Sequence, residues 1–144
     1  MIAIKENQFI EAERILNNGI NIFNESFMLN YYMGFYYKIL NKKELALTYY
    51  KKSLEYVKEE QQQNKVYNEL QNLYYELAKE FEINGNNTDA VLYYGLSCRY
   101  AQDENFKKKL ETLFIDNEYL KTIFNAAKQS KKGVLLYYLL VNGG

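Results

Sequence analysis

The sequence predicts an all-α protein made of stacked antiparallel helix hairpins, closed at the C-terminal end by a helical cap. Proline is absent from the chain and glycine is scarce before the last residues. Because both residues are common in the turns of β folds, their scarcity favours long helices. Apolar residues make up 48% of the chain, enough for a packed core, and they recur at helical spacing. One helix-pair pattern also occurs more than once.

Two copies of that pattern have identical internal spacings, each combining large apolar residues with small ones on one helix face. The first copy consists of Asn30, Met33, Gly34, Tyr37, Ala46, Tyr50 and Ser53. The second copy consists of Tyr74, Leu77, Ala78, Phe81, Ala90, Tyr94 and Ser97. In each copy we expect a small residue of one helix to face a small residue of the next, so that antiparallel helices cross closely.

A partial copy opens the chain, and the distance between copies is uneven. Ala12, Leu16 and Gly19 repeat the spacing of the second helix, and Ala12 lies 34 residues before Ala46. The step from Ala46 to Ala90 is 44 residues, and the extra residues fall in the polar segment 58–68. Since Glu and Gln form helices readily, this segment predicts lengthened helices.

The predicted elements follow from this periodicity and from the turn signals between them. We expect helices at about residues 5–22, 27–40, 43–59, 62–84, 88–102, 104–115, 117–130 and 133–141. The strongest breaker is the segment 84–87, after which Asn87 or Thr88 can cap the next helix. The segments 24–26 and 116–117 have similar roles. Repeat spacing ends near residue 104, so 105–144 is interpreted as capping helices.

The pattern resembles the tetratricopeptide repeat (TPR): an aromatic, two residues, Leu-Gly, two residues, Tyr, and later Ala, three residues and an aromatic. The resemblance covers about residues 6–104. It implies a single TPR-like domain over 1–144, with a half repeat at 6–24 and repeats at 27–60 and 71–104. The chain departs from the pattern at Asn30, which replaces the aromatic, at Ala78, which replaces glycine, and in lacking the closing proline.

The sequence also has a weaker resemblance to the ligand-binding region of bacterial peptide-sensing TPR regulators, through its 44-residue step and tyrosine-rich helices. No helix-turn-helix motif is visible, so a DNA-binding domain would lie on an upstream piece. The opening half repeat implies an apolar edge that needs cover. We therefore expect a fragment of a longer protein, with a self-associating assembly protein, dimeric through 5–22 or 134–141, as the alternative.

Catalytic and metal chemistry lack their usual residues. There is no histidine, no glycine-rich phosphate loop, and one cysteine, Cys98, which we interpret as a small buried hydrophobe. The sequence therefore predicts a non-enzyme without cofactor or metal. Basic and acidic residues balance, so nucleic acid is not an expected partner. The apolar segment 134–141 is too short to cross a membrane, and a cytoplasmic location is expected.

In TPR-like stacks the first helix of each pair lines a concave groove, and the resemblance assigns groove positions by spacing. The expected peptide-binding or partner-binding residues are Met28, Tyr31, Tyr32, Phe35, Lys38, Asn72, Tyr75, Glu76, Lys79 and Glu82. Family members that grip a free carboxylate have Lys and Asn where this chain has Tyr31 and Phe35. A neutral or apolar peptide, or a partner helix, fits better. The alternative interpretation is that these aromatics pack against neighbouring helices.

Overall fold

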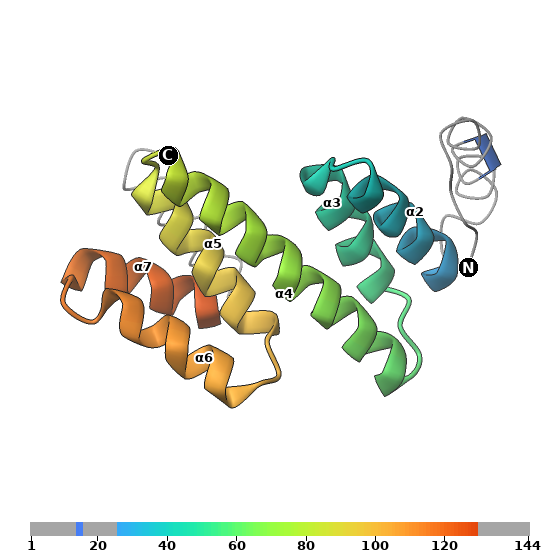
Figure 1. The fold of residues 1–144 in the computed structure, drawn as a ribbon. Coiled ribbons are helices and arrows are strands. Elements are labelled where there is room, and N and C mark those ends of the chain that lie inside the picture. The colour runs from blue at the N-terminus through green and yellow to red at the C-terminus, as the bar shows by residue number, and fades with distance from the viewer. Residues whose placement is uncertain (1–13, 16–25, 130–144) are drawn as a thin grey trace. The chain divides into compact units, whose positions relative to one another are not determined.

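The computed structural model describes residues 14, 15 and 26–129, and these fall into two compact units divided between Val66 and Tyr67. Throughout this part of the chain the regular elements are helices, with no strand (Figure 1). The all-α class and the packing of neighbouring helices are therefore confirmed. The solenoid stacking and the single domain over 1–144 stay predictions, and the units are described separately below.

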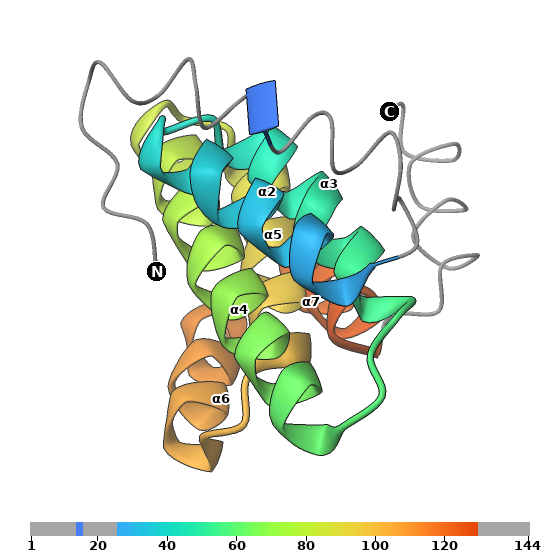
Figure 2. The same ribbon diagram turned by 90° about the vertical axis from the view of Figure 1, so that its right-hand side faces the viewer.

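Unit 1 contains a helix hairpin formed by α2 (Phe27–Ile39) and α3 (Lys43–Leu54). Figures 1 and 2 show the two helices side by side. The helix α2 begins where predicted, because the Ser26 hydroxyl accepts a hydrogen bond of 3.3 Å from the Leu29 backbone N–H. It ends in a tight turn in which Asn41 adopts a φ of 60°. This conformation is one that asparagine tolerates better than most residues.

In the hairpin of unit 1, a glycine on α2 packs against a tyrosine ring on α3. A Cβ built on Gly34 would lie 2.8–2.9 Å from three ring atoms of Tyr50, and both residues are buried. The missing side chain of Gly34 thus makes room for the flat Tyr50 ring, and the expected contact of Gly34 with a small residue stays a prediction. Asn30, fully buried, donates from Nδ2 to the Ser26 carbonyl at 2.8 Å, which gives this polar group a partner.

The predicted helix at 43–59 is too long, because α3 ends at Leu54 and α4 (Glu60–Ile83) begins after a short turn. A side chain caps the start of α4. The Gln62 Oε1 atom accepts hydrogen bonds from the backbone N–H groups of Lys58 (2.9 Å) and Glu59 (3.3 Å). A glutamine in the first turn that reaches back in this way marks a helix start.

Unit 2 contains the part of α4 from Tyr67 onward, α5 (Asn87–Tyr100), α6 (Glu104–Glu111), the 3-10 turn η1 (Thr112–Phe114) and α7 (Glu118–Gln129). The predicted helix at 104–115 is thus α6 followed by η1. Gly85, at a φ of 82°, supplies the turn after α4. The helix α5 follows Asn86, which makes no side-chain cap, so the predicted capping by Asn87 or Thr88 is wrong. Asn117 does cap α7, accepting from the Leu120 N–H at 3.1 Å.

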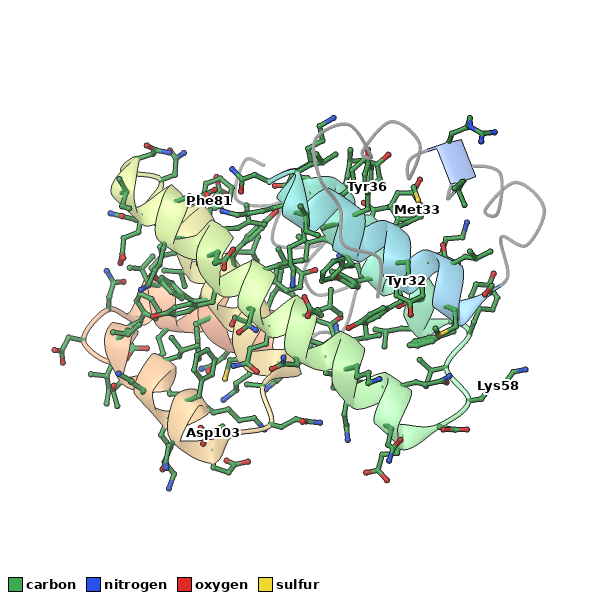
Figure 3. All side chains as sticks on the ribbon, turned by 45° about the vertical axis from the view of Figure 1, so that its right-hand side comes forward. Tyr32, Met33, Tyr36, Lys58, Phe81 and Asp103 are labelled. Atoms are coloured by element: carbon green, nitrogen blue, oxygen red, sulfur yellow. The ribbon has the colours of Figure 1, made fainter. Side chains whose placement is uncertain are left out.

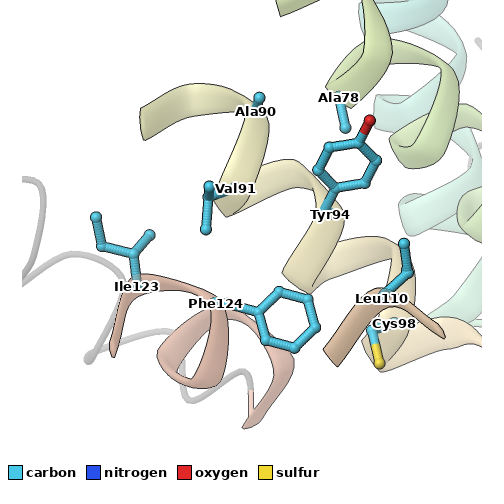
Figure 4. Close-up of a cluster of buried hydrophobic side chains, with 8 residues drawn as sticks. All are labelled: Ala78, Ala90, Val91, Tyr94, Cys98, Leu110, Ile123 and Phe124. Atoms are coloured by element: carbon cyan, nitrogen blue, oxygen red, sulfur yellow. The ribbon is translucent and has the colours of Figure 1, made fainter. Parts of the chain in front are cut away.

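The core of unit 2 joins all four of its α-helices (Figure 4). The buried cluster consists of Ala78, Ala90, Val91, Tyr94, Cys98, Leu110, Ile123 and Phe124. A close helix crossing lies between α5 and α7, where a Cβ on Gly95 would lie 2.6 Å from Ala127 Cβ and 2.7 Å from the Phe124 carbonyl. Small residues do face each other here, at a position that the repeat pattern did not single out. The prediction that Cys98 is buried is confirmed, since this residue is 1% exposed.

Several predictions concern residues outside the described part of the chain. They are the helices at 5–22 and 133–141, the half repeat at 6–24 apart from the helical residues Arg14 and Ile15, and the C-terminal end of the capping region. The two dimer surfaces, 5–22 and 134–141, belong to the same group.

Candidate functional site

The ten groove residues expected from the sequence divide equally between the two units. Five lie on α2 in unit 1: Met28, Tyr31, Tyr32, Phe35 and Lys38. Five lie on α4 in unit 2: Asn72, Tyr75, Glu76, Lys79 and Glu82. Because α2 and α4 are each continuous helices, residues three and four apart within each set share one helix face. The two sets are considered in turn.

Three of the residues expected on α2 line one hollow in unit 1, which has a volume of about 230 Å³. Figure 3 labels Tyr32 on α2 and Lys58 in the turn that leads into α4. Met28 is 49% exposed, whereas Tyr31 and Tyr32 are half-buried. The complete lining consists of Phe27, Met28, Tyr31, Tyr32, Glu59, Gln61, Gln62 and Lys65.

The aromatic wall of this hollow is held in place by ring contacts. The Tyr31 ring lies 5.7 Å from the Phe27 ring, 6.0 Å from the Tyr32 ring and 5.4 Å from the Tyr50 ring, measured between centroids. Edge-on and tilted contacts at these distances are favourable for aromatic pairs. Tyr31 therefore both packs against α3 and lines the hollow, and its role in binding stays a prediction.

Phe35 and Lys38 are not part of the hollow's lining. Phe35 is half-buried, and the Lys38 ammonium lies 5.1 Å from the centroid of its ring. This distance is within the range of a cation–π contact. The structure thus brings together three of the five residues expected on α2 and leaves these two as a separate pair.

On α4, Tyr75 is mainly a packing residue of unit 2. Its ring lies 5.7 Å from the Tyr94 ring and 5.6 Å from the Phe106 ring, and the Lys79 ammonium lies 4.6 Å from its centroid. The Glu82 carboxylate accepts a hydrogen bond of 3.1 Å from the Tyr94 hydroxyl. Two of the expected groove residues on α4 therefore contact other helices of unit 2. The Tyr75 ring packs against α5 and α6, and the Glu82 carboxylate is hydrogen-bonded to α5.

The remaining members of that set, Asn72 and Glu76, are exposed on α4. Lys79 and Glu82 are exposed as well, although each contacts an aromatic residue. The exposed side chains on α4 thus include one amide, two carboxylates and one ammonium. They form a polar face, in contrast to the aromatic wall on α2.

Two shifted pKa values occur in the core of unit 2, outside the hollow. Burial, together with the hydrogen bond to Glu82, raises the pKa of Tyr94 well above its usual range. Burial also raises the pKa of the Cys98 thiol, which keeps the sulfur protonated and therefore poorly nucleophilic at neutral pH. Neither group is poised for acid–base or nucleophilic work near pH 7.

Two features are absent from residues 14–15 and 26–129: a metal-ion cluster and a membrane-spanning helix. In that part there is no group of three or more acidic, cysteine or histidine side chains placed to hold a metal ion. None of its helices combines the length and apolarity needed to cross a membrane.

Five residues that line the hollow were not among the expected groove residues: Phe27, Glu59, Gln61, Gln62 and Lys65. Four of these belong to the segment 58–68, which the uneven repeat step singles out as additional chain. The sequence signal was therefore present, but it was interpreted only as helix length. Phe27, the first residue of α2, carried no signal that distinguished it from a core residue.

Comparison with protein-family models found no family that matches the chain. Comparisons with curated proteins and with solved structures likewise found no match. The class of the protein is therefore defined by its structure alone. It is an all-α protein with packed neighbouring helices and a small hollow lined by aromatic residues.

Proposed function

We propose that this chain is a non-catalytic, TPR-like module that binds a peptide or a segment of a partner protein on the face of α2. The observation that carries the proposal is the clustering of Met28, Tyr31 and Tyr32 around one hollow. Exposed methionine and rigid aromatic side chains form adaptable apolar binding surfaces. The resemblance of the repeat pattern to TPR sequences supports the same function.

The volume of the hollow favours a peptide over a small-molecule substrate. Pockets for drug-sized ligands and cofactors usually enclose roughly 300–1,000 Å³. The hollow, at about 230 Å³, is smaller than that range and suits a part of a larger partner. The raised pKa of the buried Cys98 thiol also supports a module without a reactive nucleophile. A single cysteine suits a cytoplasmic setting.

Selection from a displayed peptide library against the immobilised chain, followed by calorimetric titration of the selected peptide, tests this function. The structure supplies a matched pair of variants, Met28→Asp and Leu45→Asp. Met28 is 49% exposed on α2 and Leu45 is 42% exposed on α3, so both substitutions place a charge on a half-exposed helix position. We expect Met28→Asp to weaken binding at least tenfold and Leu45→Asp to leave it unchanged.

The choice of Met28 avoids an ambiguity that Tyr31→Ala or Tyr75→Ala would introduce. Both tyrosine rings contact rings on other helices, so their removal would lower stability as well as binding. If no peptide is selected, or if both aspartate variants bind the selected peptide as tightly as the unmodified chain, the proposed function is wrong.

A further inference from the structure

We infer that the hollow of unit 1 is an anchor site for one large uncharged side chain, apolar or aromatic, of a bound peptide. The inference rests on the proposed function and makes it specific, because it names the chemistry of the side chain that the partner must supply. It also assigns a role to the additional residues 58–68, which the repeat pattern leaves unexplained.

The additional residues build one wall of the hollow. Glu59, Gln61, Gln62 and Lys65 all belong to the segment that lengthens the step between the two repeats. Their position is set by the start of α4, where the Gln62 side chain holds the N–H groups of Lys58 and Glu59. A 34-residue step would lack this segment, so the hollow is a product of the lengthened helix.

The wall formed by α2 favours an apolar or aromatic anchor side chain. Phe27, Met28, Tyr31 and Tyr32 present rings and a thioether, and the rings of Phe27, Tyr31 and Tyr32 are linked by contacts of 5.7 and 6.0 Å. Burying an apolar side chain here removes its surface from water, which favours binding. Leucine, methionine or phenylalanine gains most from such a site.

The charges at the hollow argue against a charged anchor residue. The lining contains one carboxylate, on Glu59, and one ammonium, on Lys65, so its formal charge is balanced. A charged side chain entering the hollow would be attracted by one of these groups and repelled by the other. It would also lose part of its hydration, which is costly without a dedicated partner. An uncharged side chain is complementary to this lining.

The glutamines suit the backbone of the same peptide segment. Gln61 is exposed, and its amide offers both a donor and an acceptor next to the aromatic wall. A peptide that inserts one side chain brings its own N–H and C=O groups to the rim. Those groups need partners once water is displaced. The occupant is therefore an extended or turn segment with an apolar side chain between uncharged neighbours.

Methyl NMR on the full chain tests this directly, because the sequence contains three methionines, Met1, Met28 and Met33. Met28 lines the hollow, and Met33 is fully buried and serves as an internal reference. The probes are the N-acetyl amides of leucine, phenylalanine, lysine and glutamate. We expect the two apolar amides to shift the Met28 methyl signal with a dissociation constant on the order of millimolar. The charged amides and the Met33 signal should show no shift.

A charge variant checks the selectivity. Lys65→Glu makes the lining net negative, so N-acetyl-lysine amide should then shift the Met28 signal. Lys121→Glu, the same change at an exposed residue of α7 outside the lining, should not have this effect. The inference is overturned if the charged amides shift Met28 of the unmodified chain as strongly as the apolar ones, or if no amide shifts it.

The selected peptide separates failure of the anchor site from failure of the proposed function. A peptide that binds the chain without moving the Met28 methyl signal would reject the anchor site and leave the binding function standing. Failure of every library peptide and every amide to bind would reject both.

Discussion

At the scale of single residues, two glycines set how closely neighbouring helices approach. In unit 1 the space above Gly34 is filled by the Tyr50 ring, and in unit 2 the space above Gly95 is filled by Ala127 and the Phe124 carbonyl. The first contact is with a side chain that can shift slightly, whereas the second includes backbone. The two glycines therefore differ in how much a methyl group would cost.

The first prediction concerns Gly34→Ala and Gly95→Ala. Replacing a helical glycine by alanine usually gains roughly 0.5–1 kcal/mol, but overpacking costs about 1–3 kcal/mol. We expect both variants to have lower free energies of unfolding in urea, with the larger loss for Gly95→Ala. Thr48→Ala, on the exposed face of α3, should change the value by less than about 0.5 kcal/mol. A larger loss for Gly34→Ala than for Gly95→Ala would contradict this difference between the two contacts.

The second prediction follows from the raised pKa of Tyr94. In the unfolded chain this tyrosine ionises near pH ~10, but in the folded chain it keeps its proton to higher pH. Its contribution is therefore fully present below about pH 10 and is lost as the pH rises through the folded-state pKa. Between about pH 10 and the folded-state pKa, one such group lowers the free energy of unfolding by at most about 1.4 kcal/mol per pH unit. Because Glu82 is exposed, solvent screening weakens its part of the pKa shift and so narrows the pH range over which this stability is lost.

Urea unfolding at neutral and strongly alkaline pH checks this result. Tyr94→Phe should be less stable at neutral pH by about 1 kcal/mol, because the hydrogen bond to Glu82 is lost. The same variant should lose less stability than the unmodified chain on going to alkaline pH. An equal alkaline loss in both proteins would contradict the assignment to Tyr94.

At the scale of helices, spacing alone predicts where most elements lie. The buried faces of α2 to α5 coincide with the repeat positions, including Ala46, Tyr50 and Ser53, each fully buried. The end of α3 was not predictable from composition, because neither proline nor glycine occurs in residues 55–60. The start of α4 is marked by the Gln62 side chain, which accepts hydrogen bonds from the backbone N–H groups of Lys58 and Glu59.

The third prediction concerns that cap. Gln62→Ala leaves the N–H groups of Lys58 and Glu59 without the side-chain acceptor, so we expect a loss of about 1 kcal/mol in the free energy of unfolding. Faster amide exchange at those two residues should accompany the loss. Gln61→Ala removes a neighbouring glutamine that makes neither bond and should change both quantities little. Equal effects of the two substitutions would reject the cap.

At the scale of the whole molecule, the sequence predicted part of the candidate site and missed its second wall. Met28, Tyr31 and Tyr32 were identified because repeat spacing assigns each residue a face of its helix. The residues from the start of α4 were not, since a site formed by two helices depends on where a turn ends and the next helix begins. Tyr75 is the opposite case: repeat spacing assigned it to the groove, but it did not predict that the rings of Tyr94 and Phe106 pack against it.

The proposed binding surface is the face of α2 next to the start of α4. Hydrogen–deuterium exchange of the full chain, with and without a saturating selected peptide, tests it most directly. We expect slower exchange at residues 27–39 and 58–66, and no change along α3. Protection confined to α3, or to α6 and α7, with none at α2, would contradict the claim.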